Sequence, residues 1–377
     1  MIAQRINRHF RHAHLWLPGY FLNRITSGSE VDSSLPKHIF LCICDHFEPT
    51  AEGADRTKAL QRVKKWVEKY PEIAKKYHDS NGRIPKYTFF YPLEEYCSQE
   101  MQLLAELCHQ GYGEVEIHLH HDNDTAENLR NSLQKFKNLM FSQYGLLSKD
   151  KKTDEIRYAF IHGNWALNNS GPDGRFCGIN NETKVLYETG CYADFTLPSA
   201  PSETQTQKVN SLYYAADCSP MPKAHNWGTD VKSGHNNGHG LLLIQGPLML
   251  DWKRKKFGIF PRIENSSIDY NNPVTAHRIK LWIDANIHVK GKANWIFVKV
   301  HTHGCADKNI ESLLNRDLDF LFSYLSENCN DKKSFFLHFV SAREIYNIIK
   351  ALEREEVSDN SDIDKYLDYE LYFGNNH

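Results

Sequence analysis

Strand-like and helix-like segments alternate along most of this chain, and this alternation restricts its fold more than any other feature. Apolar and aromatic runs predict strands at 38–44, 86–91, 114–120, 158–161, 192–197, 212–215, 241–244, 295–300 and 334–340. Apolar residues at helical spacing predict helices at 55–70, 98–109, 125–141, 182–188, 274–285, 314–325 and 342–352. Alternating β and α units without an internal repeat predict a parallel sheet covered by helices, and a single (β/α) barrel of about eight units is the simplest such fold.

The expected barrel domain at 31–355 is flanked by segments of biased composition. Residues 1–30 form a basic arm, which could contact an anionic membrane surface or pack on its own domain. Residues 356–377 form an acidic tail, which we expect on the solvated surface. Residues 216–240 are rich in Pro, Asn, Gly, Ser and His, which predicts a long loop, either a lid over a site or a disordered segment.

Composition excludes several classes of function. A net charge of -2, from 45 basic and 47 acidic side chains, provides no field that would attract nucleic acid. Nine cysteines without zinc-finger spacing predict free thiols in a reducing compartment, so we expect a cytoplasmic protein. No run reaches the length of about 18 apolar residues that a membrane-spanning helix needs, and no transmembrane segment is expected.

The richest collection of metal-ligand side chains is the segment 114–124, which reads EVEIHLHHDND. Alternation along a strand places Val115, Ile117 and Leu119 on one face, and Glu116, His118 and His120 on the other. Two imidazoles that point the same way from a strand end predict a site for zinc or another divalent metal. The alternative is that these histidines are structural and hydrogen-bond a buried carboxylate such as Glu116.

His121 and Asp122 begin the loop after this strand. They could reach the same metal or support its ligands from behind. A second pair, His301 and His303, ends the strand expected at 295–300, and either imidazole could act as a general acid or base. Lys299 shares their face and, if it points inward, must pair with an acid such as Glu116.

Two other strand ends carry polar side chains that could take part in the chemistry. After the first strand, Asp45 could be a metal ligand, a general base or simply the cap of a loop, and His46 follows it directly. The strand end at His162 continues into Asn164 and Trp165, an amide and an indole of the kind that bind a sugar ring. Histidines in the loop at 216–240, such as His225, are expected to be solvated.

The order of these strand-end motifs, over roughly residues 38 to 350, resembles the polysaccharide deacetylase family of metal-dependent carbohydrate esterases. The pair Asp45-His46 stands where that family has Asp-Asp, which implies Asp45 as the base and His46 as a ligand. The family's two histidines, four residues apart, correspond to His118 and position 122, which is Asp122 here. The segment 162–165 replaces the family's Arg-x-Pro-Tyr wall and lacks its Arg and Pro.

The resemblance implies a distorted (β/α) barrel of seven to eight units in one large domain, with His303 as the catalytic acid. The chain also looks like an uncharacterised group of bacterial proteins that share the strings HLHHDND and HGNWAL.

The hypothesis from the sequence is therefore a metal-dependent carbohydrate hydrolase, a deacetylase, with a divalent ion that we expect to be zinc. The ligands would be drawn from His46, His118, His120 and Asp122, the catalytic groups would be Asp45 and His303, and the sugar would be held by His162, Asn164, Trp165 and His301. Two alternatives remain open: a carbohydrate-binding or assembly protein that does not catalyse a reaction, and a glycoside hydrolase with two carboxylates.

Overall fold

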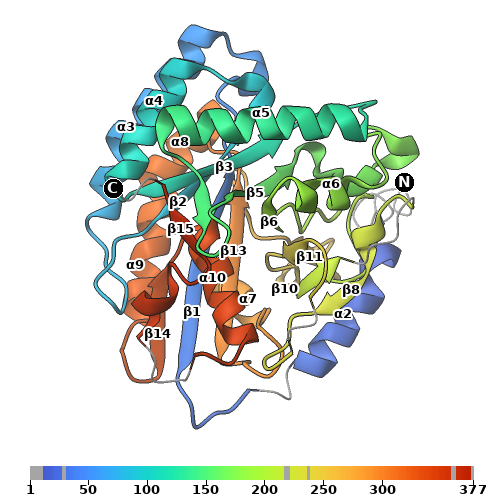
Figure 1. The fold of residues 1–377 in the computed structure, drawn as a ribbon. Coiled ribbons are helices and arrows are strands. Elements are labelled where there is room, and N and C mark those ends of the chain that lie inside the picture. Colours follow the sequence, from blue (N-terminus) through green and yellow to red (C-terminus); the bar gives the residue numbers. More distant parts are fainter. Residues whose placement is uncertain (1–11, 28–30, 216–220, 236–237, 358–361, 375–377) are drawn as a thin grey trace.

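A large, mostly parallel β-sheet organises the protein (Figure 1). The computed structural model describes residues 12–27, 31–215, 221–235, 238–357 and 362–374. β1 (Lys37–His46) lies inside this sheet and pairs in parallel with β13 (Trp295–Thr302) along nearly its whole length. On its other side, β14 (Phe335–Phe339) pairs with the first half of β1, and β2 (Tyr87–Pro92) pairs with its last residues.

The remaining strands continue this sheet from β2 and β13. The parallel order beyond β2 is β3 (Gly113–Leu119), β5 (Ile156–His162), β6 (Cys191–Asp194) and β9 (Leu242–Ile244). The antiparallel strands β7 (Leu212–Ala215) and β8 (Gly228–Asp230) follow β9, and β12 (Ser267–Ile268) pairs with β13. Four further strands form two antiparallel pairs: β4 (Ser148–Asp150) pairs with β15 (Leu371–Phe373), and β10 (Met249–Lys256) pairs with β11 (Phe260–Glu264). Since the strands from β13 to β9 run in parallel, their carboxyl ends meet at one edge of the sheet.

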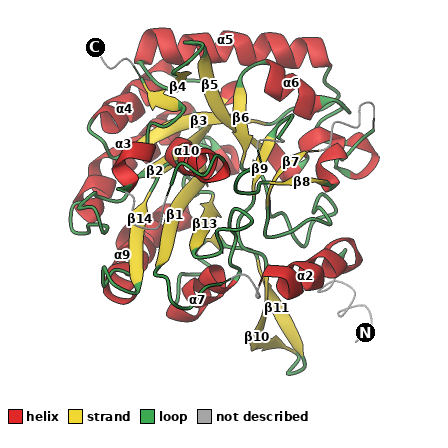
Figure 2. Ribbon diagram, turned by 60° about the horizontal axis from the view of Figure 1, so that its bottom comes forward, coloured by secondary structure: helices red, strands yellow, loops and turns green. Residues whose placement is uncertain are grey.

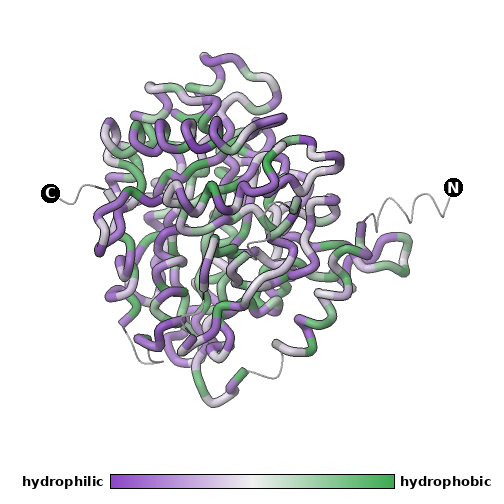
Figure 3. The backbone as a smooth tube through the Cα atoms, turned by 45° about the vertical axis from the view of Figure 1, so that its right-hand side comes forward, coloured by the Kyte–Doolittle hydropathy of each residue, from purple (hydrophilic) through white to green (hydrophobic). Residues whose placement is uncertain are grey.

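Two hydrophobic layers cover the two faces of this sheet. Ile39, Leu41 and Ile43 of β1 belong to the layer that contains α3 (Arg56–Ala74), α4 (Ser98–His109), α5 (Ala126–Tyr144) and α9 (Leu318–Asn328). The intervening Phe40, Cys42 and Cys44 belong to the other layer, with α2 (Ala13–Ser27) and α10 (Ala342–Glu353). Hydrophobic and hydrophilic residues alternate in short stretches along the backbone (Figure 3). α10 is buried on nearly all sides, and its charged side chains are paired inside the protein. The shorter helices are α6 (Glu182–Glu188), α7 (Ala276–Asp284) and α8 (Asp307–Ser312), and a π-helical turn (Leu313–Asp317) joins α8 to α9.

The structure confirms the predicted α/β alternation. Most predicted strands and helices are present within a few residues of their expected bounds. The alternation at 115–119 is also present, since Val115, Ile117 and Leu119 all belong to the layer that contains α3, α4, α5 and α9. α5 begins within one residue of where the sequence predicts. Thr125 is its N-cap and accepts from the backbone N–H of Asn128, and Asp124 accepts from the N–H of Thr125.

The two ends of the chain contain more structure than the sequence predicted. The arm forms α2, whose Trp16 and Tyr20 are buried, while residues 1–11 and 28–30 lie outside the described residues. The tail includes β15, with Leu371 buried. β15 pairs with β4, whose edge is otherwise free on that side. Of the predicted lid, residues 216–220 and 236–237 lie outside the described residues, and part of the rest forms β8.

The hairpin of β10 and β11 was not predicted from the sequence. It lies beside α2 (Figure 2), and the hydroxyl of Tyr20 accepts from the backbone N–H of Leu250. Among the described residues, no helix has both the length and the apolar character that crossing a lipid bilayer requires.

Glu116 is a buried carboxyl group on the face of β3 opposite Val115 and Ile117. Its Oε1 accepts from the hydroxyl of Tyr192 at 2.6 Å, and its Oε2 accepts from the backbone N–H of Ala159 at 2.5 Å. Burial raises the pKa of Glu116 to about 8, although both hydrogen bonds act in the opposite direction. Glu116 therefore keeps a proton in the folded protein at pH values where the unfolded chain has lost it.

We predict that the free energy of unfolding falls as the pH rises from about 5 to about 9, by up to about 1.4 kcal/mol per pH unit for this group. The sign follows because the native state binds the extra proton. Glu116→Gln, which mimics the protonated form, should flatten this slope in urea titrations at several pH values. Asp45 and Asp194, whose pKa values burial raises to about 8 and about 7, leave a residual slope. The exposed Glu127→Gln is the matched control, and an equal slope in wild type and Glu116→Gln would contradict the prediction.

Candidate metal centre

Imidazoles from three strand ends gather around one carboxylate at the carboxyl edge of the sheet. His46 ends β1, His118 lies in β3 with His120 just after it, and His303 follows β13. Glu48 lies two residues beyond β1 and belongs to both ligand groups found there, His46/Glu48/His303 and Glu48/His118/His120. The ligand atoms within each group lie within 4.8 Å of one another. We call these five residues the Glu48 cluster.

The orientation of two of the imidazoles is suited to metal binding. The Nδ1 atoms of His118 and His120 lie 2.8 Å from the carbonyl oxygen of Ile161 and 2.7 Å from Oε1 of Glu94. Both partners are acceptors, so each Nδ1 carries a proton and donates it. The Nε2 atoms then face Glu48 Oε1, at 3.1 Å and 3.4 Å. An imidazole held by its Nδ1–H, with Nε2 turned to a shared centre, is the usual arrangement of a metal ligand.

His46 is the third imidazole that could hold an ion. It is buried, and its Nε2 has no hydrogen-bond partner among the described residues. Its ring stacks on that of His303, with centroids 4.6 Å apart, and lies edge-on to His118 at 5.0 Å. Burial, together with its neighbouring histidines, holds the pKa of His46 well below its usual value. A neutral, buried and unpaired Nε2 costs free energy unless a ligand satisfies it.

Glu48 and His120 carry opposite charges in the absence of metal. Burial alone would raise the pKa of Glu48, but hydrogen bonds from His118 and His120 hold it below its usual range. Burial would lower the pKa of His120, but Glu48 and Glu94 raise it to about 10. The cluster therefore attracts a positive charge, which either a proton or a metal ion could supply.

Asp45, the predicted base, lies on the opposite face of β1 from His46. Its Oδ1 accepts from the backbone N–H of Gly304 at 2.6 Å, and its Oδ2 accepts from the hydroxyl of Tyr87 at 2.9 Å. Trp66 holds the same turn by donating to the carbonyl oxygen of Gly304 at 3.0 Å. Asp45 thus fixes the turn that follows His303.

Two of the predicted sugar-binding residues lie beside the Glu48 cluster. The indole of Trp165 lies 6.2 Å from the ring of His46 and 5.9 Å from that of His303, and its buried Nε1 has no partner among the described residues. The ring of His301 lies 6.1 Å from that of His46. Asn164 is exposed, in a turn with φ of +54°.

The remaining predicted residues lie elsewhere. Asp122 is exposed, and its Oδ1 accepts from the backbone N–H groups of Asn123 and Phe176, so it belongs to neither ligand group. Lys299 is buried, but the suggested pairing with Glu116 is wrong. Its Nζ donates to the carbonyl oxygen of Leu197 at 2.8 Å. Glu116 is held by other donors.

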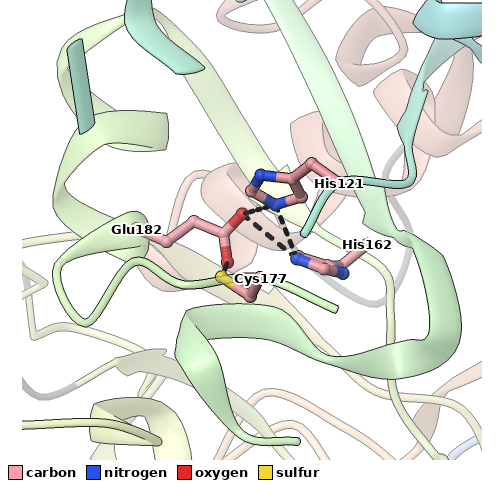
Figure 4. A group of neighbouring side chains, drawn as sticks. All are labelled: His121, His162, Cys177 and Glu182. Atoms are coloured by element: carbon pink, nitrogen blue, oxygen red, sulfur yellow. Dashed lines mark hydrogen bonds and ion pairs between the residues drawn. The ribbon is translucent and has the colours of Figure 1, made fainter. Parts of the chain in front are cut away.

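A second group of ligand side chains lies nearby in the chain but is distinct from the first. His121, His162, Cys177 and Glu182 bring their ligand atoms within 4.8 Å of one another (Figure 4), and we call them the Cys177 cluster. His162, which was predicted to bind sugar, belongs to this group. Cys177 and Glu182 were missed, because neither lies at the end of a predicted strand. Glu48 was also missed as a central residue, although it stands two positions after His46.

In comparisons with known proteins, no family model matches this chain, and no curated protein matches it. The geometry of the two clusters is therefore the basis for the functional argument.

Gly304 is the most constrained position near the Glu48 cluster. A Cβ added there would lie 2.0 Å from Oδ2 of Asp45 and 2.9 Å from the side chain of Trp66. We predict that Gly304→Ala lowers the free energy of unfolding by about 3 kcal/mol or more, since neither buried neighbour can move away. Gly53→Ala is the control: its φ is +74°, nothing lies within 4 Å, and backbone strain alone should cost about 1–2 kcal/mol. Equal losses in chemical denaturation would show that the Asp45 contact is not rigid.

Proposed function

We propose that this protein is a metal-dependent hydrolase that removes an acetyl group from a carbohydrate. The observation that carries the proposal is the Glu48 cluster, in which Nδ1-anchored imidazoles turn their Nε2 atoms toward one carboxylate at the carboxyl edge of a parallel sheet. In enzymes built on parallel sheets and (β/α) barrels, this edge is where active sites lie.

The ion would be held by Nε2 of His118, Nε2 of His120 and a carboxylate oxygen of Glu48, whose ligand atoms lie within 4.8 Å of one another. Nε2 of His46 would approach it from the neighbouring group, which shares Glu48. Neutral imidazole and carboxylate ligands suit zinc. A bound divalent ion would supply a Lewis acid for the acetyl carbonyl and would acidify a water molecule.

His303 is the group that we propose to move protons. It is largely buried, stacked on His46, and burial lowers its pKa, so its ring is neutral near pH 7 and can accept a proton. A ring nitrogen of His303 would take a proton from the attacking water and pass it to the leaving oxygen or nitrogen of the sugar. Asp45 acts as a positioning residue, because it holds the backbone of Gly304 next to this imidazole.

The sugar would bind against Trp165. Its indole lies beside His46 and His303, and an aromatic ring of this kind suits contact with the apolar face of a sugar. Asn164, exposed in the same turn, and His301, beside His46, would complete this surface.

We also propose that the sheet closes into a distorted barrel of seven to eight units. The hydrogen bond from Lys299 of β13 to Leu197, just after β6, supports this closure because it joins strands that are far apart in the sheet order. A cytoplasmic location is supported by the described cysteines, all of which are free thiols.

The proposal predicts that the purified protein contains zinc bound at this cluster and releases acetate from acetylated oligosaccharides. His118→Ala should remove one equivalent of metal and lower acetate release by at least about a hundred-fold, since ligand loss should cost at least as much as loss of a supporting residue. His109→Ala is the control, because His109 is exposed and bonds only the carbonyl oxygen of Tyr144 among the described residues. Metal content and acetate are measured in the same preparations.

Two other outcomes would replace the proposal. Glycan binding without acetate release would favour a binding or assembly protein, an alternative that the orientation of Asp45 away from the cluster supports. Release of reducing ends without acetate would point to a glycoside hydrolase. Unchanged metal content in His118→Ala would refute the ligand assignment.

We further propose that α2 and the β10–β11 hairpin rest on an anionic membrane surface. Phe21, Leu22 and Ile25 of α2 are exposed, as are Trp252 and Ile259 at the hairpin, and the hairpin lies beside α2. The hairpin sequence also carries exposed lysines at positions 253 and 255. Exposed aromatic and aliphatic residues next to lysines suit insertion at a lipid interface rich in anionic headgroups.

Removing the two hairpin side chains with Trp252→Ala and Ile259→Ala together should reduce co-sedimentation with phosphatidylserine-containing vesicles by about ten-fold or more, from lost apolar burial. Phe320→Ala, which removes an exposed aromatic residue from α9, should leave binding unchanged. Vesicles of phosphatidylcholine alone test the role of charge. Equal sedimentation of the double variant and wild type would exclude this surface.

A further inference from the structure

The Cys177 cluster joins segments that are separate in the sequence. His121 follows β3, His162 ends β5, Cys177 lies in the loop after β5, and Glu182 begins α6. All four side chains are largely or fully buried. Figure 4 shows them pointing toward one another around a common centre.

The two imidazoles of this cluster repel each other unless a positive charge lies between their Nε2 atoms. Nδ1 of His121 lies 2.8 Å from Oδ2 of Asp124, and Nδ1 of His162 lies 2.6 Å from the carbonyl oxygen of Gly163. Both partners are acceptors, so both Nδ1 atoms carry the proton. In the neutral rings the two Nε2 lone pairs then face each other at 2.8 Å, with Glu182 Oε1 at 3.0 Å and 3.3 Å.

The Cys177 thiol and a further buried histidine, His225, lie close to Glu182. The Cys177 thiol donates to Oε2 of Glu182 at 3.4 Å, and its Sγ accepts from the backbone N–H of Ile179 at 3.5 Å. His225 is fully buried, and both of its ring nitrogens lack a partner among the described residues. This residue was expected to be solvated, but it lies close enough to Glu182 and His162 for their charges to influence its pKa, which burial lowers to about 3.

We propose that the Cys177 cluster is a structural zinc site, with Nε2 of His121 and His162, Sγ of Cys177 and a carboxylate oxygen of Glu182 as its ligands. Four protein ligands complete the tetrahedral coordination of zinc and leave no position for a substrate, which distinguishes it from a catalytic site. The Cys177 thiol would lose its proton to solvent when the ion binds.

The separations of the ligand atoms are compatible with this coordination. Tetrahedral zinc with bonds of about 2.0–2.3 Å places its ligand atoms about 3.3–3.6 Å apart. The contacts of 2.8, 3.0 and 3.3 Å among the two Nε2 atoms and Oε1 of Glu182 need to change by only a few tenths of an ångström. Sγ of Cys177 lies within 4.8 Å of the other ligand atoms. Asp124 and the carbonyl of Gly163 would fix the two rings from behind, as outer hydrogen-bond partners commonly do.

The zinc would fasten the segment between β5 and α6 to the ends of β3 and β5. That segment has several short turns with positive φ, at Asn164, Asn168 and Asp173, and little regular structure of its own. It also carries Trp165. A zinc cross-link here would hold Trp165 in place beside the Glu48 cluster without taking part in the chemistry.

Cobalt substitution tests this site separately from the Glu48 cluster, which contains no cysteine. The metal-free protein titrated with Co²⁺ should develop the near-ultraviolet charge-transfer band of a cobalt–thiolate bond. Cys177→Ala should lose this band and one equivalent of zinc, whereas Cys108→Ala, which removes another buried thiol, should keep both. His118→Ala should also keep the band, so failure of the proposed hydrolase site and failure of this one are distinguishable.

X-ray absorption at the zinc edge of the wild-type protein provides a measurement that depends on no variant. A sulfur neighbour at about 2.3 Å is expected. Bound zinc without a sulfur neighbour, or a cobalt complex without the thiolate band, would overturn the proposal. Those results would indicate instead that a proton on His121, whose pKa Glu182 and Asp124 raise to about 8 despite burial, bridges the cluster.

Discussion

Parallel pairing of β1 with β13, β14 and β2 is the constraint on which the rest of the structure depends. Because these strands run in the same direction, side chains from segments more than 250 residues apart meet at one edge of the sheet. His46 and His303 stack on each other only because β1 and β13 are paired in register up to their carboxyl ends. The layer that contains α3, α4, α5 and α9 covers the opposite face, where Asp45 is buried.

The two ligand clusters follow the same electrostatic principle. In each, one carboxylate, the half-buried Glu48 or the buried Glu182, is faced by the Nε2 atoms of two imidazoles whose Nδ1 atoms are already engaged. Such a group needs a cation, and each cluster could hold either a proton or a metal ion. The difference lies in the other residues. The Glu48 cluster borders Trp165 and an unpaired His46, whereas the Cys177 cluster contains a thiol and is enclosed.

Local pattern predicted much of the architecture. Helical and strand periodicity located most elements because each buries one face, and alternation along β3 correctly separated Glu116 and His118 from their apolar neighbours. Failures occurred where long-range contacts decided the structure. β15 pairs with the free edge of β4. Lys299 donates to the carbonyl oxygen of Leu197, which lies 102 residues earlier in the chain. Neither partner can be recognised from a single strand.

The sequence by itself determined the α/β class and the strand ends at which imidazoles are concentrated, because periodicity and residue type are local properties. Only the tertiary structure decided how these imidazoles are shared. His120 and His121 are adjacent in the chain, yet one faces Glu48 and the other faces Glu182. Neither Glu48 nor Glu182 lies next to these histidines in the sequence, so the partners of each histidine depend on strand pairing and loop path. These are set by the whole fold rather than by neighbouring residues.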